Sequence, residues 1–206
     1  MTTVESKGDA LSSSEFNVKL FVENPAGVDL EELIPVFHRW IREELLEDEL
    51  PIDVAGYARV PKGPGVVIVC DHAHYYFDER AGRPGLRYRG RRVARGEGEE
   101  GITRAFRSLL RAAALLEKEP ALGGRYRFRT DQVEFGINDR LRAPSHAQTL
   151  AAVRPALESA VKALYGKPAK SMALASGPRE PFMVSIETGT SPSVEALLGQ
   201  LAAVAG

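Results

Sequence analysis

The first apolar pattern of the chain is a strand followed by a helix. Phe16, Val18, Leu20 and Val22 alternate with polar neighbours, which predicts a strand with one buried face. A helix is predicted after Asn24-Pro25, with Asp29 as its N-cap. Its apolar positions recur at helical spacing and are Leu30, Leu33, Phe37, Ile41 and Leu45. Pro35 either restarts this helix or kinks it.

The remaining pattern alternates runs of strands with single helices. Three strands are predicted over 52–60, 66–77 and 86–95, and a helix over 102–119. Two strands around Thr130-Asp131 follow within 125–141, and then a helix over 145–164 that begins at Ser145. Strands over 171–174 and 182–187 and a helix over 191–204 complete the chain.

This order of elements predicts an α+β fold. Runs of strands between helices favour a largely antiparallel sheet with about four helices packed mainly on one face, and disfavour a doubly wound parallel sheet. Residues 1–15 carry no apolar run and are expected to form a flexible N-terminal tail. Residues 16–206 then form a single domain, or alternatively two subdomains over 16–96 and 101–206.

Composition narrows the function classes only slightly. The 206 residues include 27 basic and 28 acidic side chains, and a net charge of −1 excludes nucleic-acid or membrane binding through bulk charge alone. The single cysteine, Cys70, excludes an internal disulfide and a Cys-based structural zinc site. The chain shows no secretory signal and no apolar run long enough to span a bilayer, so we expect a cytoplasmic protein without a membrane partner.

One candidate site is the segment that contains Cys70, His72 and His74. On a single strand these side chains share a face, and thiol and imidazole groups are ligands for transition metals. His38 or His146 is the expected further ligand. The alternative interpretation is a strand whose polar end is hydrated, and in that case no cofactor is expected.

A second candidate site consists of two rows of alternating arginines. The first row is Arg87, Arg89 and Arg91, and the second is Arg125, Arg127 and Arg129. Like charges side by side on a sheet repel one another, so such a face requires acids, solvent or an anionic partner. The partner would be a small anion, an acidic protein or nucleic acid. The alternative is a solvated face with ordinary ion pairs.

Three further polar residues complete the candidate ligand-binding set. Asp71 lies beside the histidines, and Asp139 and Arg140 follow a predicted strand end, where they either orient a ligand or stabilise a turn. The chain contains no G-x-S-x-G, no phosphate-binding loop that ends in Gly-Lys-Ser/Thr and no H-E-x-x-H motif, which leaves no recognisable catalytic pattern.

Four segments resemble a family of bacterial proteins of about this length to which no activity is assigned. They are Val36 to Ile41, Ile52 to Tyr57, Gly63 to Val66 and Ile137 to Pro144. The resemblance implies a bacterial, soluble protein and no particular reaction. Family members read roughly His-Glu-Ala-Asp-Tyr where this chain has Asp71-His72-Ala73-His74-Tyr75.

The sequence therefore predicts a binding or interaction module rather than an enzyme. It would present an arginine-rich sheet face to a protein or a small anionic ligand. The first alternative is an enzyme or metal-binding protein that uses Cys70, His72 and His74. The second is a nucleic-acid binder that uses both arginine rows.

Overall fold

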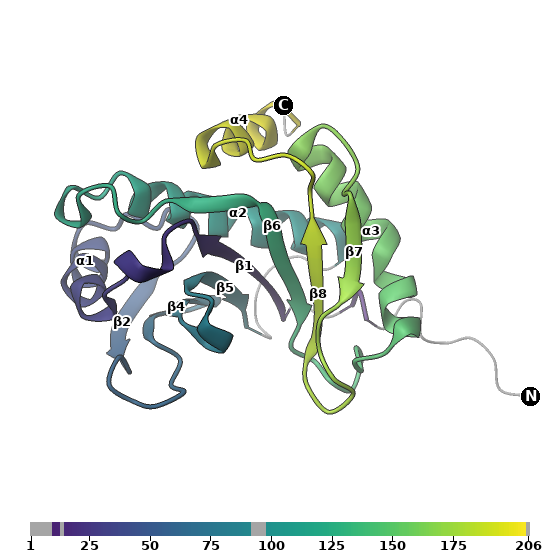
Figure 1. Cartoon of the computed structure of the whole chain (residues 1–206), viewed down its shortest axis with the longest axis horizontal. Helices are drawn as coiled ribbons and strands as arrows, with labels where there is room; N and C mark the ends of the chain where they lie inside the picture. Colours follow the sequence, from purple (N-terminus) through teal and green to yellow (C-terminus); the bar gives the residue numbers. More distant parts are fainter. Residues whose placement is uncertain (1–9, 13–14, 92–97, 205–206) are drawn as a thin grey trace, which may run out of the picture.

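The computed structural model describes residues 10–12, 15–91 and 98–204 and contains one eight-stranded antiparallel sheet (Figure 1). Its strand order is β2-β3-β4-β5-β1-β6-β8-β7. The strands are β1 (Phe16–Val22), β2 (Pro51–Gly56), β3 (Val66–Cys70), β4 (Ala73–Asp78), β5 (Gly85–Gly90), β6 (Phe128–Ile137), β7 (Ser171–Leu174) and β8 (Phe182–Glu187). This arrangement confirms the predicted α+β class.

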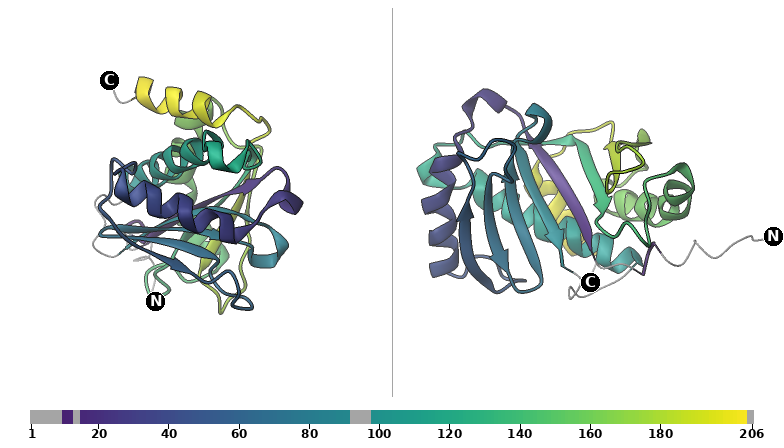
Figure 2. Two further views of the ribbon diagram at one scale, coloured as in Figure 1. Left: turned by 90° about the vertical axis from the view of Figure 1, so that its left-hand side faces the viewer. Right: turned by 90° about the horizontal axis from the view of Figure 1, so that it is seen from below.

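Four α-helices lie on one side of the sheet, and the strands are seen in front of them from the opposite side (Figure 2). They are α1 (Leu30–Arg42), α2 (Gly98–Glu117), α3 (Ala147–Tyr165) and α4 (Val194–Val204). Helix α1 packs on β2 and β3, α2 packs on β1 and β5, and α3 and α4 pack on α2 and on each other. Three short 3₁₀ turns, Pro25–Gly27, Arg80–Gly82 and Pro120–Leu122, lie between these elements. In the described part of the chain no helix is long and apolar enough to cross a membrane.

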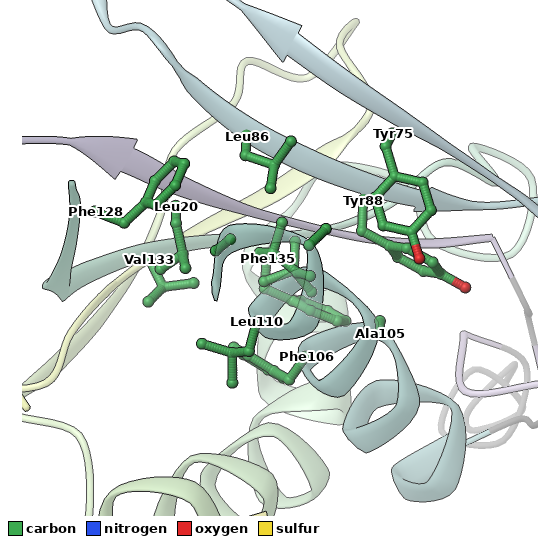
Figure 3. Packing of buried hydrophobic residues seen from close by; sticks show 14 of the residues in the cluster. Leu20, Tyr75, Leu86, Tyr88, Ala105, Phe106, Leu110, Phe128, Val133 and Phe135 are labelled. Atoms are coloured by element: carbon green, nitrogen blue, oxygen red, sulfur yellow. The ribbon is translucent and has the colours of Figure 1, made fainter. Parts of the chain in front are cut away.

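The core lies between the sheet and α2. Leu20 of β1, Leu86 of β5 and Phe135 of β6 point toward Phe106 and Leu110 of the helix (Figure 3). All five side chains are buried, and complete burial of an aliphatic or aromatic side chain stabilises a fold by about 1.5–3 kcal/mol. The prediction that Phe16, Val18, Leu20 and Val22 form a buried face of β1 is therefore confirmed.

The sequence placed two strand boundaries wrongly. Residues 66–77 form two strands rather than one, because the chain reverses at Asp71-His72 between β3 and β4. Residues 125–141 form one strand, β6, rather than two. A β-bulge displaces residues 130–132 of β6 from the register of β1 and interrupts the alternation there. Beyond Arg91, residues 92–95 of the predicted strand 86–95 lie outside the described residues.

The sheet is curved, and its helix-free face is the concave one (Figure 1). The β7–β8 loop reaches across this face toward the β4–β5 loop, where the side chains of Glu180 and Arg80 are 3.8 Å apart. One continuous sheet thus joins strands from both halves of the chain. Residues 1–9 of the expected tail lie outside the described residues, whereas Ala10 is buried in the core.

Candidate functional site

The concave face of the sheet holds a pocket of about 1080 Å³, which we call the open-face pocket. Its floor is formed by β1, β4, β5 and β6, and its walls by the loops that follow β2, β4 and β7. The register explains which side chains meet there, since residues directly opposite in antiparallel strands share a face. Glu134, Lys19, Arg87 and Tyr76 form one row across four strands.

The second row of the floor lies one pleat farther along. It consists of Gly136, Asn17, Arg89 and His74. Gly136 lets Met183 and Asn17 pack closely over the strand, because a Cβ there would lie 2.3 Å from the Met183 sulfur and 2.7 Å from Nδ2 of Asn17. Any larger residue at Gly136 would displace these side chains.

A buried network of charges holds the first row in place. The Lys19 ammonium donates to Oδ1 of Asp78 at 2.6 Å and to the backbone oxygen of Arg83 at 2.8 Å. Arg87 donates to Oδ2 of Asp78, to Oδ1 of Asn17 and to Oε2 of Glu134, at 3.3, 2.8 and 3.1 Å. Lys19 is 1% exposed, so its charge depends on these partners.

The environment of this network shifts the pKa values of Asp78 and Lys19. Burial by itself raises the pKa of Asp78, but the charges of Lys19 and Arg87, with the hydrogen bonds from Lys19 and the Arg80 N–H, lower it below its ordinary value. Burial lowers the pKa of Lys19, and Asp78 opposes this effect only in part. Asp78 is therefore a carboxylate at neutral pH.

Arg83 extends the network toward the pocket wall. Its guanidinium lies over the Phe21 ring, 3.6 Å from the centroid, and donates to Oε1 of Gln132 at 2.8 Å. It also donates to Oε1 of Glu134 at 3.4 Å. Both carboxylates of the floor, Asp78 and Glu134, are thus fully engaged with cations.

Arg89 differs from the other basic residues of the floor. The Arg89 side chain is half-buried and lines the pocket. Its guanidinium makes no hydrogen bond and no ion pair with any described residue. The neighbouring His74 has a buried Nδ1 without a hydrogen-bond partner in the same set. Burial, with the charges of Arg91 and Arg89, lowers the pKa of His74.

The pocket as a whole carries an excess of basic side chains. The basic residues that line it are Lys19, Lys62, Arg80, Arg83, Arg87 and Arg89. The acidic ones are Asp78, Glu79, Glu134 and Glu180. Six cations against four carboxylates contrast with the net charge of −1 of the whole chain. The positive charge is therefore a local property of this face.

The first arginine row reaches the open face only in part. Arg87 and Arg89 lie in the pocket as the alternation predicted. Arg91 follows the end of β5, where its Nη1 donates to the backbone oxygens of Cys70 and Asp71 at 3.3 and 2.9 Å. Arg91 thus holds the turn between β3 and β4 rather than the pocket floor.

The second arginine row reaches the face of the first only at Arg129, which is opposite Phe21 of β1, and this corrects the expectation that all six arginines share one face. Arg125 and Arg127 precede β6 and form ion pairs with Glu32 of α1 and Glu117 of α2. Arg129 pairs with Asp131 at 2.8 Å. β6 is shorter than predicted at its start, so the first two arginines lie outside the sheet.

The structure separates the four predicted metal ligands. Cys70 is buried against the helices, and burial together with the charges of Glu49 and Asp71 raises the pKa of its thiol. His74 lies on the opposite, concave face, and His38 is exposed on α1. The prediction that Cys70, His72 and His74 share one strand face is wrong, because the turn at Asp71-His72 reverses the chain between them.

His72 instead meets two carboxylates. Glu49, Asp71 and His72 each offer one possible metal-ligand atom, and these three atoms lie within 4.8 Å of one another. Among the described residues, no other group of three or more His, Cys, Asp or Glu side chains is this close together. Nδ1 of His72 is 2.6 Å from Oδ2 of Asp71. Burial, with the nearby charges of Asp71 and Asp48, raises the pKa of Glu49 to about 7.

Asp139 stabilises a turn, which is the second of its two predicted roles. Its Oδ1 accepts hydrogen bonds from the backbone N–H groups of Leu141 and Arg142, and its Oδ2 from Nη1 of Arg142 at 2.9 Å. Arg140 next to it is exposed. Neither residue lines the open-face pocket.

Sequence reasoning did not assign the acids and the lysine of the floor to a site. Lys19 and Asn17 occupy the polar positions of a strand whose alternation was recognised, and Glu134 occupies the same parity in β6. This parity was the available signal. It did not reveal that Asp78 and Lys19 meet, because they are 59 positions apart in the sequence.

Comparison with models of protein families and with curated proteins gives no match, so the geometry of the chain carries the functional argument.

Proposed function

We propose that this protein binds a small organic anion in the open-face pocket, with the negative group of the ligand on Arg89. The observation that carries the proposal is that, among the described residues, no acid pairs with Arg89, on a floor that already has more cations than carboxylates. A guanidinium presents donors in a planar fork, and carboxylate and phosphate groups accept two of them at once.

The buried network supports this assignment because it leaves Arg89 as the available cation of the sheet floor. Lys19, Arg83 and Arg87 each hold fixed partners, so they supply positive potential without having to move. Asp78 and Glu134 are already engaged by these cations and do not compete for Arg89. A pre-organised floor of this kind reduces the entropy that binding would otherwise cost.

The remaining lining suggests an organic ligand rather than a bare inorganic ion. Tyr76 is half-buried in the floor, and Tyr57 and Val60 of the β2–β3 loop are exposed apolar side chains at the wall. A pocket of this size accommodates a ligand with an apolar or aromatic portion beside its negative group. The proposal assigns binding and no reaction.

The pocket favours a small ligand over nucleic acid or an acidic protein surface. The three loops enclose the floor, and the second arginine row, which a long polyanion would need, is engaged with acids elsewhere. The bacterial, cytoplasmic setting that we propose for this function rests on the sequence resemblance alone.

Calorimetric titration of the full chain with phenyl phosphate, benzoate and inorganic phosphate tests the proposal. We expect phenyl phosphate to bind more tightly than inorganic phosphate, and Arg89→Gln to weaken it at least about tenfold, because a charge-assisted hydrogen bond contributes about 1.5–3 kcal/mol. The matched control is Arg140→Gln, which removes an exposed arginine outside the pocket and should leave the affinity unchanged.

Two results would overturn the proposal. One is equal binding by the wild-type protein and Arg89→Gln. The other is no binding of any of the three probes together with strongly salt-dependent binding of single-stranded DNA, which would instead favour a nucleic-acid binder.

A further inference from the structure

The ladder between β2 and β3 continues past the ends of both strands. Pro51 is opposite Cys70, and beyond this pair the backbones of Leu50 and Asp71 remain in contact. The Asp71 N–H donates to the Leu50 oxygen at 3.1 Å, and the Leu50 N–H donates to Oδ1 of Asp71 at 3.0 Å. One further step in this antiparallel register places Glu49 opposite His72.

The register therefore gathers three side chains from two segments. Glu49 lies in the loop between α1 and β2, while Asp71 and His72 form the turn between β3 and β4. Their ligand atoms lie within 4.8 Å of one another, and two ligands of a single ion at about 2.0–2.2 Å each are never farther apart than about 4.4 Å. Small side-chain rotations therefore suffice to bring all three onto one ion.

The surroundings fix two of the three groups in place. Oδ1 of Asp71 is held by the Leu50 N–H, which leaves Oδ2 directed at His72. The guanidinium of Arg91 donates to the backbone oxygens of Cys70 and Asp71 and so braces the turn. Hydrogen bonds of this kind orient ligands in metal sites.

An independent observation at Glu49 indicates a missing partner. Its Oε2 is buried and accepts no hydrogen bond from any described residue. A buried carboxylate oxygen without a partner is unfavourable because it has lost its hydration, and a cation would compensate for that loss. The Asp71–His72 contact at 2.6 Å does not supply the partner, because it engages the other two members of the group.

We propose that Glu49, Asp71 and His72 bind one divalent transition-metal ion. Two carboxylates and one imidazole suit Zn²⁺, Mn²⁺ or Fe²⁺, whereas the imidazole nitrogen disfavours Mg²⁺ and Ca²⁺. Three protein ligands leave a coordination position for water or for an external ligand. None of the three residues lines the open-face pocket, so this site is distinct from the proposed anion site.

The test is titration of the chelator-treated full chain with Zn²⁺ by calorimetry and with Co²⁺ by visible absorption. We expect one equivalent of either ion to bind, with Co²⁺ bands of a four- or five-coordinate site. His72→Ala and Glu49→Gln should each weaken binding at least about tenfold, since even indirect supports of metal ligands contribute about 10–100-fold. Mg²⁺ should not compete.

Matched variants separate this group from the other histidine and the thiol nearby. His74→Ala and Cys70→Ser should retain wild-type Zn²⁺ affinity, and circular dichroism of each variant establishes that it is folded. The proposal fails if the wild-type protein binds no Zn²⁺ or Co²⁺, if folded His72→Ala binds them as well as the wild type, or if His74→Ala or Cys70→Ser abolishes binding. Phenyl phosphate affinity of His72→Ala stays unchanged, so the two proposals fail independently.

Discussion

Lys19 and Asp78 form a buried ion pair of 2.6 Å on the face of the sheet that no helix covers. Lys19 is central in the sheet on β1, and Asp78 is the last residue of β4. Burial of two charges costs desolvation energy, which is compensated only if both charges have further hydrogen-bond or ionic partners. Here those partners are Arg87, Glu134 and the backbone oxygen of Arg83. Their mutual arrangement shapes the pocket floor.

Removal of one member of this pair should destabilise the fold. Asp78→Asn leaves the Lys19 ammonium buried with only a neutral side chain and a backbone oxygen as acceptors, and we expect the free energy of unfolding to fall by about 3 kcal/mol. Urea denaturation at neutral pH measures this change. Lys19→Met combined with Asp78→Leu should recover most of the loss, because no uncompensated charge remains.

The control for this prediction is the exposed pair of Glu31 and Arg59. Glu31→Gln should leave the urea midpoint almost unchanged, since solvent screens that pair. If Asp78→Asn behaves like Glu31→Gln, the buried network does not contribute to stability as described.

The lowered pKa of Asp78 should appear as a pH dependence of stability. The unfolded chain takes up the proton near the ordinary value of 3.8, before the folded protein does, so this contribution is present above that value and is lost as the pH falls below it. The groups that face Asp78 are Lys19, Arg87 and, through them, Glu134. Asp78→Asn should therefore flatten the stability profile between about pH 5 and about pH 3. An unchanged slope would contradict the assignment.

Asp139 is expected to affect stability and not binding. Asp139→Ala removes acceptors for two backbone N–H groups and for Arg142, which should lower the free energy of unfolding by about 1–2 kcal/mol. Thermal denaturation measures the loss. Phenyl phosphate affinity should remain that of the wild type, and a selective loss of affinity would place Asp139 in the binding site instead.

The thiol of Cys70 should be unreactive in the folded protein. It is buried, and burial together with the charges of Glu49 and Asp71 raises its pKa, so very little thiolate exists near neutral pH. Iodoacetamide should label one thiol in denaturant and almost none without it, as followed by mass spectrometry. Rapid labelling of the native chain would show that the β3 end is more open than the structure indicates.

The local pattern of apolar and polar residues predicted most of the helices and strands. The alternation of Phe16, Val18, Leu20 and Val22 predicted the face of β1 that packs in the core, because burial of one face leaves a period of two that a short window reveals. Helix α3 ends at Gly166, whose left-handed backbone has a φ of 70°. The eight predicted strands matched the number observed only because the two boundary errors cancelled.

The errors arose where the local signal was weak or interrupted. The turn at Asp71-His72 contains no glycine or proline, so the apolar run of β3 continued without a visible break into β4. In β6 the bulge at residues 130–132 resembled a turn between two strands.

By itself the sequence determined the α+β class, the core-facing residues of β1 and the position of Arg87 and Arg89 on the opposite face of the sheet, since these depend on neighbours along the chain. Only the tertiary structure decided which charges meet. Strand order brought Lys19 to Asp78 and left Arg89 without an acid among the residues that the structure describes, and the β2–β3 register brought Glu49 to His72. Register and strand order depend on the packing of the whole core, because the same alternating strands fit several partners equally well until that core is complete.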